Sequence, residues 1–266
     1  MAPVAVTGAS GKTGRALTAA LRARGVAVRG LHRPGTDLDT GRGLDALAGC
    51  DAVVVIVPNV HPDEPGVVAR VLAAARRHGV RRVVYHSVAQ PYAPAMPHHV
   101  DKAVAEDLVR RSGTDWTVLQ PCAYTQNLLP GLAAAEPELA VPYSTLTPFA
   151  FVDLADVAEA TATVLREDGH VGATYELGGP GAVSVADVAA VASEVLGRPV
   201  RARRTDPREW AAGPGAALPA EPRRRLLAMF ASYDEHGLLA GSLVLRALLG
   251  RPSADVRAVL TRHLVH

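Results

Sequence analysis

The sequence predicts an α/β fold of the doubly wound kind, in which helices cover both faces of a parallel β-sheet. Through the first half of the 266-residue chain, short β-rich runs alternate with longer amphipathic stretches, which is the pattern of βαβ units. The run Asp51–Val57 is almost continuously Val and Ile, as expected for a strand buried on both faces. Apolar residues make up 48% of the chain and aromatic residues only 4%, which favours Ala, Val and Leu packing between helices and a sheet.

The expected elements of the first half follow from this periodicity. Strands are expected at residues 3–7, 26–32, 51–57, 81–87 and 116–120. Helices are expected at residues 13–24, 64–78 and 97–111. The last of these helices begins with Pro97 and is followed by Gly113, residue types favoured at a helix start and just beyond a helix end.

The pattern changes after Pro121. A Pro-containing, irregular stretch is expected as far as Pro148, followed by helices and short strands. These later elements are expected at 153–166 with Asp153 as the N-cap, 174–177, 185–196 after a capping box that starts at Ser184, 200–204, 221–239 and 253–264. A Gly-containing hinge is expected between the last two helices.

This change of pattern predicts two regions. Residues 1–125 are expected to form a dinucleotide-binding domain, with residues 150–180 packing back onto it. Residues 126–149 and 181–266 are expected to form a smaller, mostly helical region that binds the substrate and acts as a lid.

Composition argues against several other classes of protein. The net charge is +2, and the densest basic cluster, Arg223–Arg225, heads an apolar helix, so we expect no nucleic-acid partner. The two cysteines, Cys50 and Cys122, give neither metal-ligand spacing nor a disulfide framework, so no metal is expected. No purely apolar run is longer than Ala52–Val57, which is too short to span a membrane, and a strand is expected almost at the N-terminus. We therefore expect a cytoplasmic protein.

A glycine-rich turn follows the first expected strand and opens the first helix. Its spacing is Gly8-x-x-Gly11-x-x-Gly14, with Ser10, Lys12 and Thr13 between the glycines. Glycines allow a tight turn and a close approach of the backbone to a pyrophosphate, while the helix N-terminus supplies N–H groups and a positive dipole. The turn predicts a dinucleotide site; the alternative is a plain strand-to-helix turn.

The end of the second expected strand predicts which dinucleotide is bound. An acidic residue there binds the ribose 2′-hydroxyl, whereas a basic residue accommodates the 2′-phosphate. The chain reads His32-Arg33 at this point, with no carboxylate before Asp37. NADPH is therefore the expected cofactor, although Arg33 could also be an ordinary exposed arginine.

Lysine is rare in this chain. Only Lys12 and Lys102 occur, against twenty-six arginines. A compact ammonium differs from a planar guanidinium in reach, hydration and ease of pKa adjustment. Lys12 lies inside the glycine-rich turn, and Lys102 lies near the start of an expected helix, four residues after His98. Both positions suit a dinucleotide-dependent enzyme.

Several motifs together resemble the NmrA-like family of atypical short-chain dehydrogenases/reductases. They are Val84-Tyr85-His86-Ser87-Val88, Pro97-His98-His99-x-x-Lys102-x-x-x-Glu106, Trp116-Thr117-Val118-Leu119-Gln120-Pro121-x-x-Tyr124-x-x-Asn127, Tyr175-Glu176-Leu177-Gly178-Gly179 and Leu249-Gly250-Arg251-Pro252. The resemblance covers nearly the whole chain and implies a Rossmann-like fold. Members of this family include NADPH-dependent quinone and aromatic-ether reductases, and also redox-sensing regulators without turnover.

The resemblance also implies roles for particular residues. Lys102 matches the lysine that contacts the nicotinamide ribose, but His98 stands where typical short-chain dehydrogenases carry the proton-donating Tyr. Residues four apart share a helix face, so His98, Lys102 and Ser87 are the expected catalytic residues. The alternative is that Lys102 pairs with Glu106 on an exposed face and that His98 caps a helix start. The other expected contacts are Val57, Pro58, Ser87, Lys102, Pro121 and Tyr124 for the cofactor and His99, Tyr124, Asn127 and Phe149 for the substrate.

A second departure from the family concerns the third strand. Arg33 is followed by only three residues before Asp37-Leu38, where the family usually has a helix and a strand. A crossover helix and a new parallel strand need a dozen residues or more. The third strand is therefore expected to be shortened or missing, which would leave the adenine pocket open or remodelled.

These observations predict an NADPH-dependent reductase of a small hydrophobic carbonyl, quinone or enone. Two alternatives stay open: an NADP(H)-sensing regulatory protein without turnover, and a non-redox cyclase or isomerase on the same scaffold. The expected partner is the small substrate, with a homodimer left open and no membrane association.

Overall fold

The structure is a computed structural model that describes residues 2–265. The chain divides into two compact units, and each is described by itself. The first unit contains the chain up to Tyr92, His98–Gln120 and Val157–Tyr175. The second contains Ala93–Pro97, Pro121–Asp156 and the chain from Glu176 onward.

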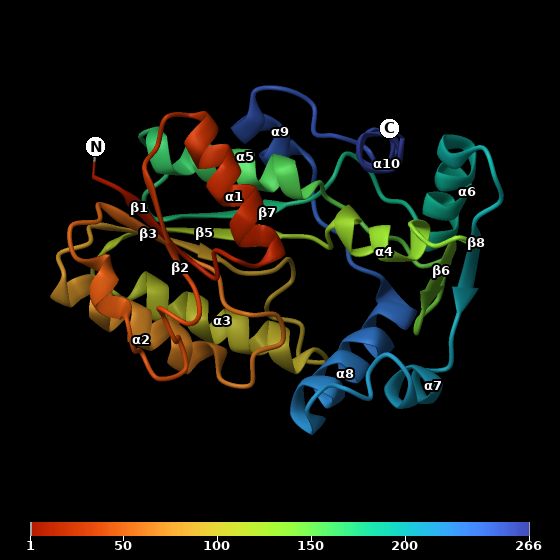
Figure 1. Ribbon diagram of the computed structural model, residues 1–266, viewed down its shortest axis with the longest axis horizontal. Helices are drawn as coiled ribbons and strands as arrows, with labels where there is room; N and C mark the ends of the chain where they lie inside the picture. Colours follow the sequence, from red (N-terminus) through yellow and green to blue (C-terminus); the bar gives the residue numbers. More distant parts are fainter. Residues whose placement is uncertain (1, 266) are drawn as a thin grey trace. The chain divides into compact units, whose positions relative to one another are not determined.

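The first unit is built on a six-stranded sheet with the order β2-β1-β3-β4-β5-β7 (Figure 1). Its strands are β1 (Val4–Thr7), β2 (Val28–Leu31), β3 (Ala52–Val55), β4 (Arg82–His86), β5 (Asp115–Pro121) and β7 (Ala173–Leu177). Neighbouring strands from β2 to β5 pair in parallel, with Val4 opposite both Val28 and Ala52. This confirms the predicted doubly wound α/β fold.

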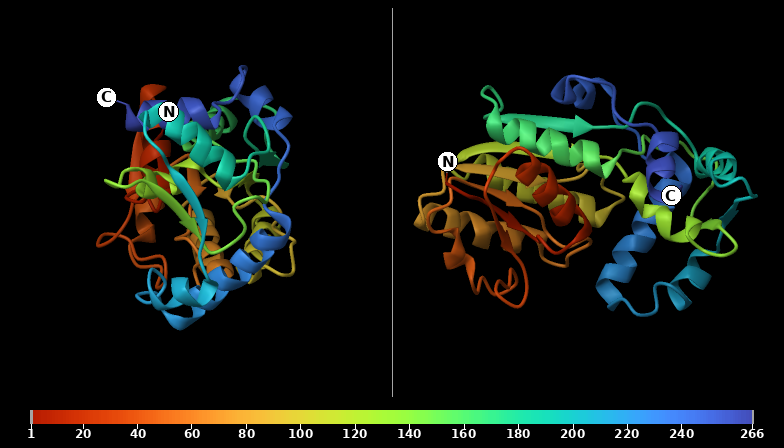
Figure 2. Two further views of the ribbon diagram at one scale, coloured as in Figure 1. Left: turned by 90° about the vertical axis from the view of Figure 1, so that its right-hand side faces the viewer. Right: turned by 45° about the horizontal axis from the view of Figure 1, so that its top comes forward.

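Helices cover both faces of this sheet. They are α1 (Lys12–Ala23), α2 (Glu64–Arg77), α3 (Pro97–Arg110) and α5 (Leu154–Arg166). Figure 1 shows α2 and α3 on one face and α1 and α5 on the other, and the right-hand view of Figure 2 shows α1 and α5 in front of the sheet. The crossovers leave no face of β3 or β4 to solvent, which explains their nearly continuous runs of Val.

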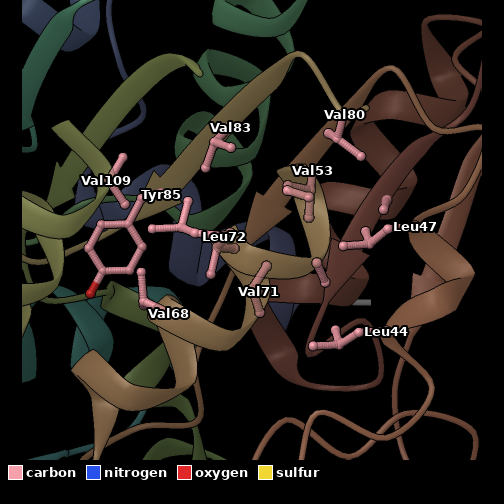
Figure 3. Packing of buried hydrophobic residues seen from close by; sticks show 14 of the residues in the cluster. Leu44, Leu47, Val53, Val68, Val71, Leu72, Val80, Val83, Tyr85 and Val109 are labelled. Carbon is pink, nitrogen blue, oxygen red and sulfur yellow. The ribbon is translucent and has the colours of Figure 1, made fainter. Parts of the chain in front are cut away.

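The hydrophobic core lies between the sheet and α2 (Figure 3). Because side chains alternate along a strand, Val53, Val83 and Tyr85 point to the same face and meet the apolar side of α2, which includes Val68 and Val71. All five are fully buried. Burial of each such side chain contributes about 1.5–3 kcal/mol, so this layer fixes α2 against β3 and β4.

The strand that would follow β2 is absent, as predicted. β2 is the edge of the sheet, and residues 32–51 contain only a short 3-10 helix, η1 (Leu44–Leu47), and an isolated bridge between Asp37 and Arg42. Leu44 and Leu47 are buried in the same core as α2. Residues 32–51 therefore pack Leu44 and Leu47 beside α2, and too few residues remain for another parallel strand.

The second unit contains a small parallel sheet that the sequence did not reveal. β6 (Glu138–Val141) pairs with β8 (Arg201–Arg204), and α6 (Val185–Leu196) packs against both strands. α10 (Val256–Leu264) packs in turn on α6. The left-hand view of Figure 2 shows these two strands beside α6. The stretch after Pro121 as far as Pro148 was predicted to be irregular, and that prediction is wrong at β6. The strand is short and its partner lies about sixty residues later in the chain, so no local pattern marks it.

The remaining elements of the second unit are short helices and one long helix. They are η2 (Thr125–Asn127), α4 (Leu129–Leu132), α7 (Pro207–Ala212), α8 (Ala220–His236) and α9 (Leu243–Leu249). α9 lies in the segment predicted as a hinge, so that prediction is wrong in part. Its seven residues are too few for a clear helical period between Gly241 and Gly250.

The capping box of α6 gives a test of local stability. The Ser184 hydroxyl accepts a hydrogen bond from the Asp187 N–H, and the Asp187 carboxylate accepts one from the Ser184 N–H. Ser184→Ala is expected to lower the free energy of unfolding by about 1 kcal/mol, measured by urea denaturation. Ser242→Ala is the matched control, because Ser242 is the N-cap of α9 and makes no side-chain cap. Equal effects of the two substitutions would contradict this account.

Candidate functional site

The glycine-rich turn joins β1 to α1 with a geometry that only glycine allows at two positions. Gly8 has φ +61°, in the left-handed region, and its carbonyl accepts the N–H of Gly11 at 2.9 Å. A Cβ placed on Gly14 would lie 2.3 Å from the Gly8 oxygen and 2.6 Å from the Cα of Ala9. The first turn of α1 therefore packs directly against the end of β1.

The N-terminus of α1 is open to an anionic ligand. Gly11 is its N-cap, no side chain caps the helix, and its first turn carries no acidic residue. Ser10, Gly11 and Lys12 are exposed. N–H groups of a first helical turn have no partner within the helix, and the helix dipole favours negative charge there. The residues present fit the pyrophosphate of a dinucleotide.

The end of β2 carries the two basic residues predicted from the sequence. His32 and Arg33 are both exposed. The Arg33 guanidinium lies 2.7 Å from a carboxylate oxygen of Asp39 and 3.5 Å from one of Asp37. Asp39 also lies 2.7 Å from Nε2 of His61. Asp39 and His61 were not predicted, because no periodic element carries them and both appear in the sequence as loop residues.

Val57 and Pro58 follow β3 at the carboxyl ends of the sheet's strands. Val57 is buried and Pro58 is exposed. Just before them, the Thr7 hydroxyl donates to the Ile56 carbonyl and accepts the Ile56 N–H, both at 2.8 Å. This pair of hydrogen bonds ties the end of β1 to the end of β3, where the strand order changes direction. Open α/β sheets bind ligands at such a switch point.

Lys102 lies in a buried ionic network beyond the end of β4. Its ammonium lies 2.6 Å from Oε1 of Glu64, and it also donates to the carbonyl of His86 at 3.5 Å. Oε1 of Glu64 accepts a second hydrogen bond, from the Tyr85 hydroxyl at 2.7 Å. The side chain of Lys102 is only 12% exposed and that of Glu64 only 2%. The alternative of an exposed pair between Lys102 and Glu106 is therefore wrong.

This network keeps the Tyr85 phenol protonated and orients the Lys102 ammonium. Burial and the adjacent Glu64 carboxylate raise the pKa of Tyr85 well above its usual value, so the phenol stays protonated and donates. An ammonium has three N–H donors. Two of those of Lys102 are used within the described chain, by the Glu64 carboxylate and the His86 carbonyl.

Glu106 anchors a second network, which includes Ser87. Its buried carboxylate accepts hydrogen bonds from the Ser87 hydroxyl at 2.5 Å and from the Gln120 amide at 2.8 Å, and it forms an ion pair with Arg110 at 2.8 Å. The hydrogen of the Ser87 hydroxyl points inward to Glu106. Ser87 can then accept a hydrogen bond from a ligand, but it has no second hydrogen to donate.

Three buried histidines surround the network. The rings of His98 and His99, in the first turn of α3, meet edge to face with centroids 4.5 Å apart. Burial lowers the pKa of His99 to about 4, although its contact with the Gln90 carbonyl opposes the shift. The side chain of His86 contacts the Thr161 hydroxyl at 3.0 Å. That hydroxyl donates to the Val157 carbonyl, so it accepts from Nε2–H of His86.

The predicted residues of the first unit thus gather at the carboxyl ends of β1, β2, β3 and β4. No site role was predicted for Glu64, Tyr85 or Gln120, and Glu106 was considered only as an exposed partner of Lys102, yet these four residues form the hydrogen-bond networks around Lys102 and Ser87. Glu64 begins α2, where an acidic residue is ordinary. The rarity of lysine identified Lys102, but no sequence signal identified its partner.

The four remaining predicted residues belong to the second unit. Pro121 is buried, Tyr124 is half-buried and Asn127 is exposed. Phe149 is fully buried, with ring centroids 5.1 Å from Phe151 and 5.2 Å from Tyr233. Phe149 is therefore a core residue of the second unit in this structure and reaches no surface.

Residues 8–168 match the protein family described as NAD(P)H-binding. The chain belongs to this family. The match spans more than half of the chain and includes the glycine-rich turn, Arg33, Ser87 and Lys102. It agrees with the cofactor class expected from the geometry of the α1 N-terminus.

Two relatives are similar over much of the chain. This chain is 36% identical to the NAD(P)H azoreductase of Xenophilus azovorans over 187 residues. These residues are 68% of this chain and 64% of that protein, so the chain spans slightly less than two thirds of that relative's length. It is 34% identical to the (4-alkanoyl-5-oxo-2,5-dihydrofuran-3-yl)methyl phosphate reductase of Streptomyces griseus over 218 residues, which are 74% of this chain and 75% of that protein.

Two solved structures share the fold over almost their whole length. The NADPH-dependent quinone oxidoreductase of Escherichia coli, complexed with NADPH, has a TM-score of 0.81 at 23% identity and covers 97% of this chain and 99% of its own. NmrA, a negative transcriptional regulator, has a TM-score of 0.78 at 18% identity, and the match covers 98% of this chain and 95% of NmrA. Both an oxidoreductase and a regulator therefore have this fold, which agrees with the fold implied by the NmrA-like resemblance of the sequence.

Residues 2–265 contain no helix with the length and apolar content to cross a bilayer. The same residues contain no group of three or more His, Cys, Asp or Glu side chains that could hold a metal ion.

The buried histidines predict that acid destabilises the protein. Burial, and then the charge of Lys102, lowers the pKa of His86 to about 4, whereas an unfolded histidine takes up its proton near pH 6.5. The stability is therefore complete above pH 6.5 and is lost as the pH falls toward 4. Between pH 7 and pH 5, His86 is expected to account for about 2 kcal/mol of lost unfolding free energy.

Urea denaturation at several pH values measures this loss. His86→Gln should flatten the dependence, while His236→Gln, at an exposed position, should leave it intact. If both variants follow the wild-type curve, His86 is not the group that titrates.

Proposed function

We propose that this protein is an NADPH-dependent reductase of a small hydrophobic carbonyl, quinone or enone. The observation that carries the proposal is the position of the Lys102 ammonium, held by Glu64 on the sheet edge that also bears the glycine-rich turn. The names of its relatives support a reductase. One is an NAD(P)H azoreductase, and another acts, by its name, on an unsaturated oxo-furan ring.

The first unit offers the contacts that NADPH requires. The backbone N–H groups at the start of α1 would hold the pyrophosphate, and the glycines would keep side chains away from it. Arg33 would bind the 2′-phosphate, exchanging the Asp39 carboxylate for it. This favours NADPH over NADH. When bound, the cofactor supplies a hydride to the substrate.

The residues beyond β4 would orient the substrate and handle a proton. Reduction of a carbonyl or quinone needs a hydrogen-bond donor at the acceptor oxygen and then a proton for it. The third N–H of Lys102 suits the first task. His98, one helical turn before Lys102 on α3, suits the second as the proposed proton donor. Ser87 would accept a hydrogen bond only from a ligand that carries an N–H or O–H group, because its own hydrogen is held by Glu106.

A cofactor-sensing regulator is the second candidate function. Two observations favour it: His98 replaces the Tyr of ordinary short-chain dehydrogenases, and the Ser87 hydroxyl donates inward. Such a protein would bind NADP(H) through the same glycine-rich turn and would not transfer a hydride.

Titration with NADPH and NADH, followed by turnover assays, tests the proposal. We expect NADPH to bind at least about tenfold more tightly than NADH, because only NADPH engages the Arg33 guanidinium with a phosphate. A panel of quinones and enones should then yield NADPH consumption. His98→Gln should lower kcat by about 100-fold, the usual scale of general acid catalysis, without changing NADPH binding; His236→Gln, at an exposed position, should lower neither.

Each other outcome has its own meaning. Binding of NADPH without turnover on a broad panel would favour the regulator. Activity without any nicotinamide would favour a cyclase or isomerase. Full turnover in His98→Gln would remove His98 as the proton donor, and binding of neither nucleotide would overturn the proposal.

A further inference from the structure

A cavity of about 650 Å³ lies within the second unit, and none of its lining residues belongs to the site described above. It is formed by Pro142 after β6, Arg204 at the end of β8, α7 and α8. The lining residues of α8 are Arg223, Leu227, Phe230, Ala231 and Asp234, whose spacing places them on one helical face. The volume is within the range of small-molecule sites, roughly 300–1,000 Å³.

One part of the lining is apolar. Phe230 is buried, and its ring meets that of Trp210 edge to face at 4.8 Å. Leu227 is half-buried, and Pro142 and Ala211 complete this surface. A ligand seated here would bury its own apolar surface against a packed aromatic layer, which is favourable in proportion to the area removed from water.

The other part is cationic. Among the described residues, three arginines and one carboxylate line the cavity. Arg204 forms an ion pair with Asp234 at 2.6 Å. Arg208 and Arg223 form no ion pair or side-chain hydrogen bond within residues 2–265, although Arg223 is half-buried. A guanidinium partly withdrawn from water and without a counter-ion is well placed to bind a carboxylate or phosphate in a bidentate manner.

We propose that this cavity binds a small anionic amphiphile, a molecule that joins one carboxylate or phosphate group to an apolar body. Arg208 and Arg223 bind the anionic group, and Leu227 and Phe230 contact the apolar body. Binding requires no nucleotide, so it does not depend on the reductase proposal and its outcome can be separated from turnover.

Trp210 offers a direct readout of this binding. The chain has two tryptophans, so a Trp116→Phe background leaves the fluorescence of Trp210, which contacts Phe230. The full-length protein, without nucleotide, is titrated with decanoate, decyl phosphate, decyltrimethylammonium and inorganic phosphate, each below its micelle-forming concentration. We expect saturable changes with the two anionic amphiphiles and none with the other two probes; the tighter of the two identifies the head group.

Substitutions then locate the site. Arg208→Gln with Arg223→Gln should weaken binding of the anionic amphiphiles at least about tenfold, since charge-assisted hydrogen bonds are lost. Arg246→Gln is the matched control, because Arg246 is exposed on α9 and does not line the cavity. Equal binding of decyltrimethylammonium, or unchanged affinity in the double variant with its fold intact by circular dichroism, would overturn the proposal.

Discussion

The candidate site depends on one buried charge, the carboxylate of Glu64. A carboxylate removed from water is costly unless it is paired and hydrogen-bonded. Here a single oxygen meets both the Lys102 ammonium and the Tyr85 hydroxyl. These partners come from α3 and β4, while Glu64 begins α2. These contacts hold the start of α2, the first turns of α3 and the end of β4 together, and they fix the position of the Lys102 ammonium.

The parallel sheet makes this placement useful. The carboxyl ends of β1, β2, β3 and β4 lie on one edge, so the glycine-rich turn, Arg33 and Ser87 share that edge with Lys102. Separate contacts hold each of these groups. Close packing of the glycines fixes the turn, Asp39 pairs with Arg33, and Glu106 accepts the hydrogen bond of Ser87. Because these supports are independent, a change in one part of the site can alter cofactor preference or catalysis while the fold is kept.

The sequence predicted the fold of the first unit well because its helices are long and amphipathic, and because β3 and β4 are largely apolar on both faces. It also singled out candidate site residues that carry a local signal, such as Gly14 and Lys102, whose roles stay predictions. It could not predict β6, whose strand partner is distant in sequence. Nor could it predict Glu64 as the partner of Lys102, because these residues lie 38 positions apart on α2 and α3, so tertiary packing sets the pair and no spacing pattern marks it.

A double-mutant cycle on Glu64 and Lys102 tests this account most directly. The unfolding free energies of Glu64→Gln, Lys102→Met and the double variant are compared with that of the wild type by urea denaturation at pH 7. Removing one partner of a buried pair costs about 3–5 kcal/mol, so each single variant should be strongly destabilised. The double variant should lose about as much as one single variant alone. Additive losses would contradict the account, because the two side chains would then act independently.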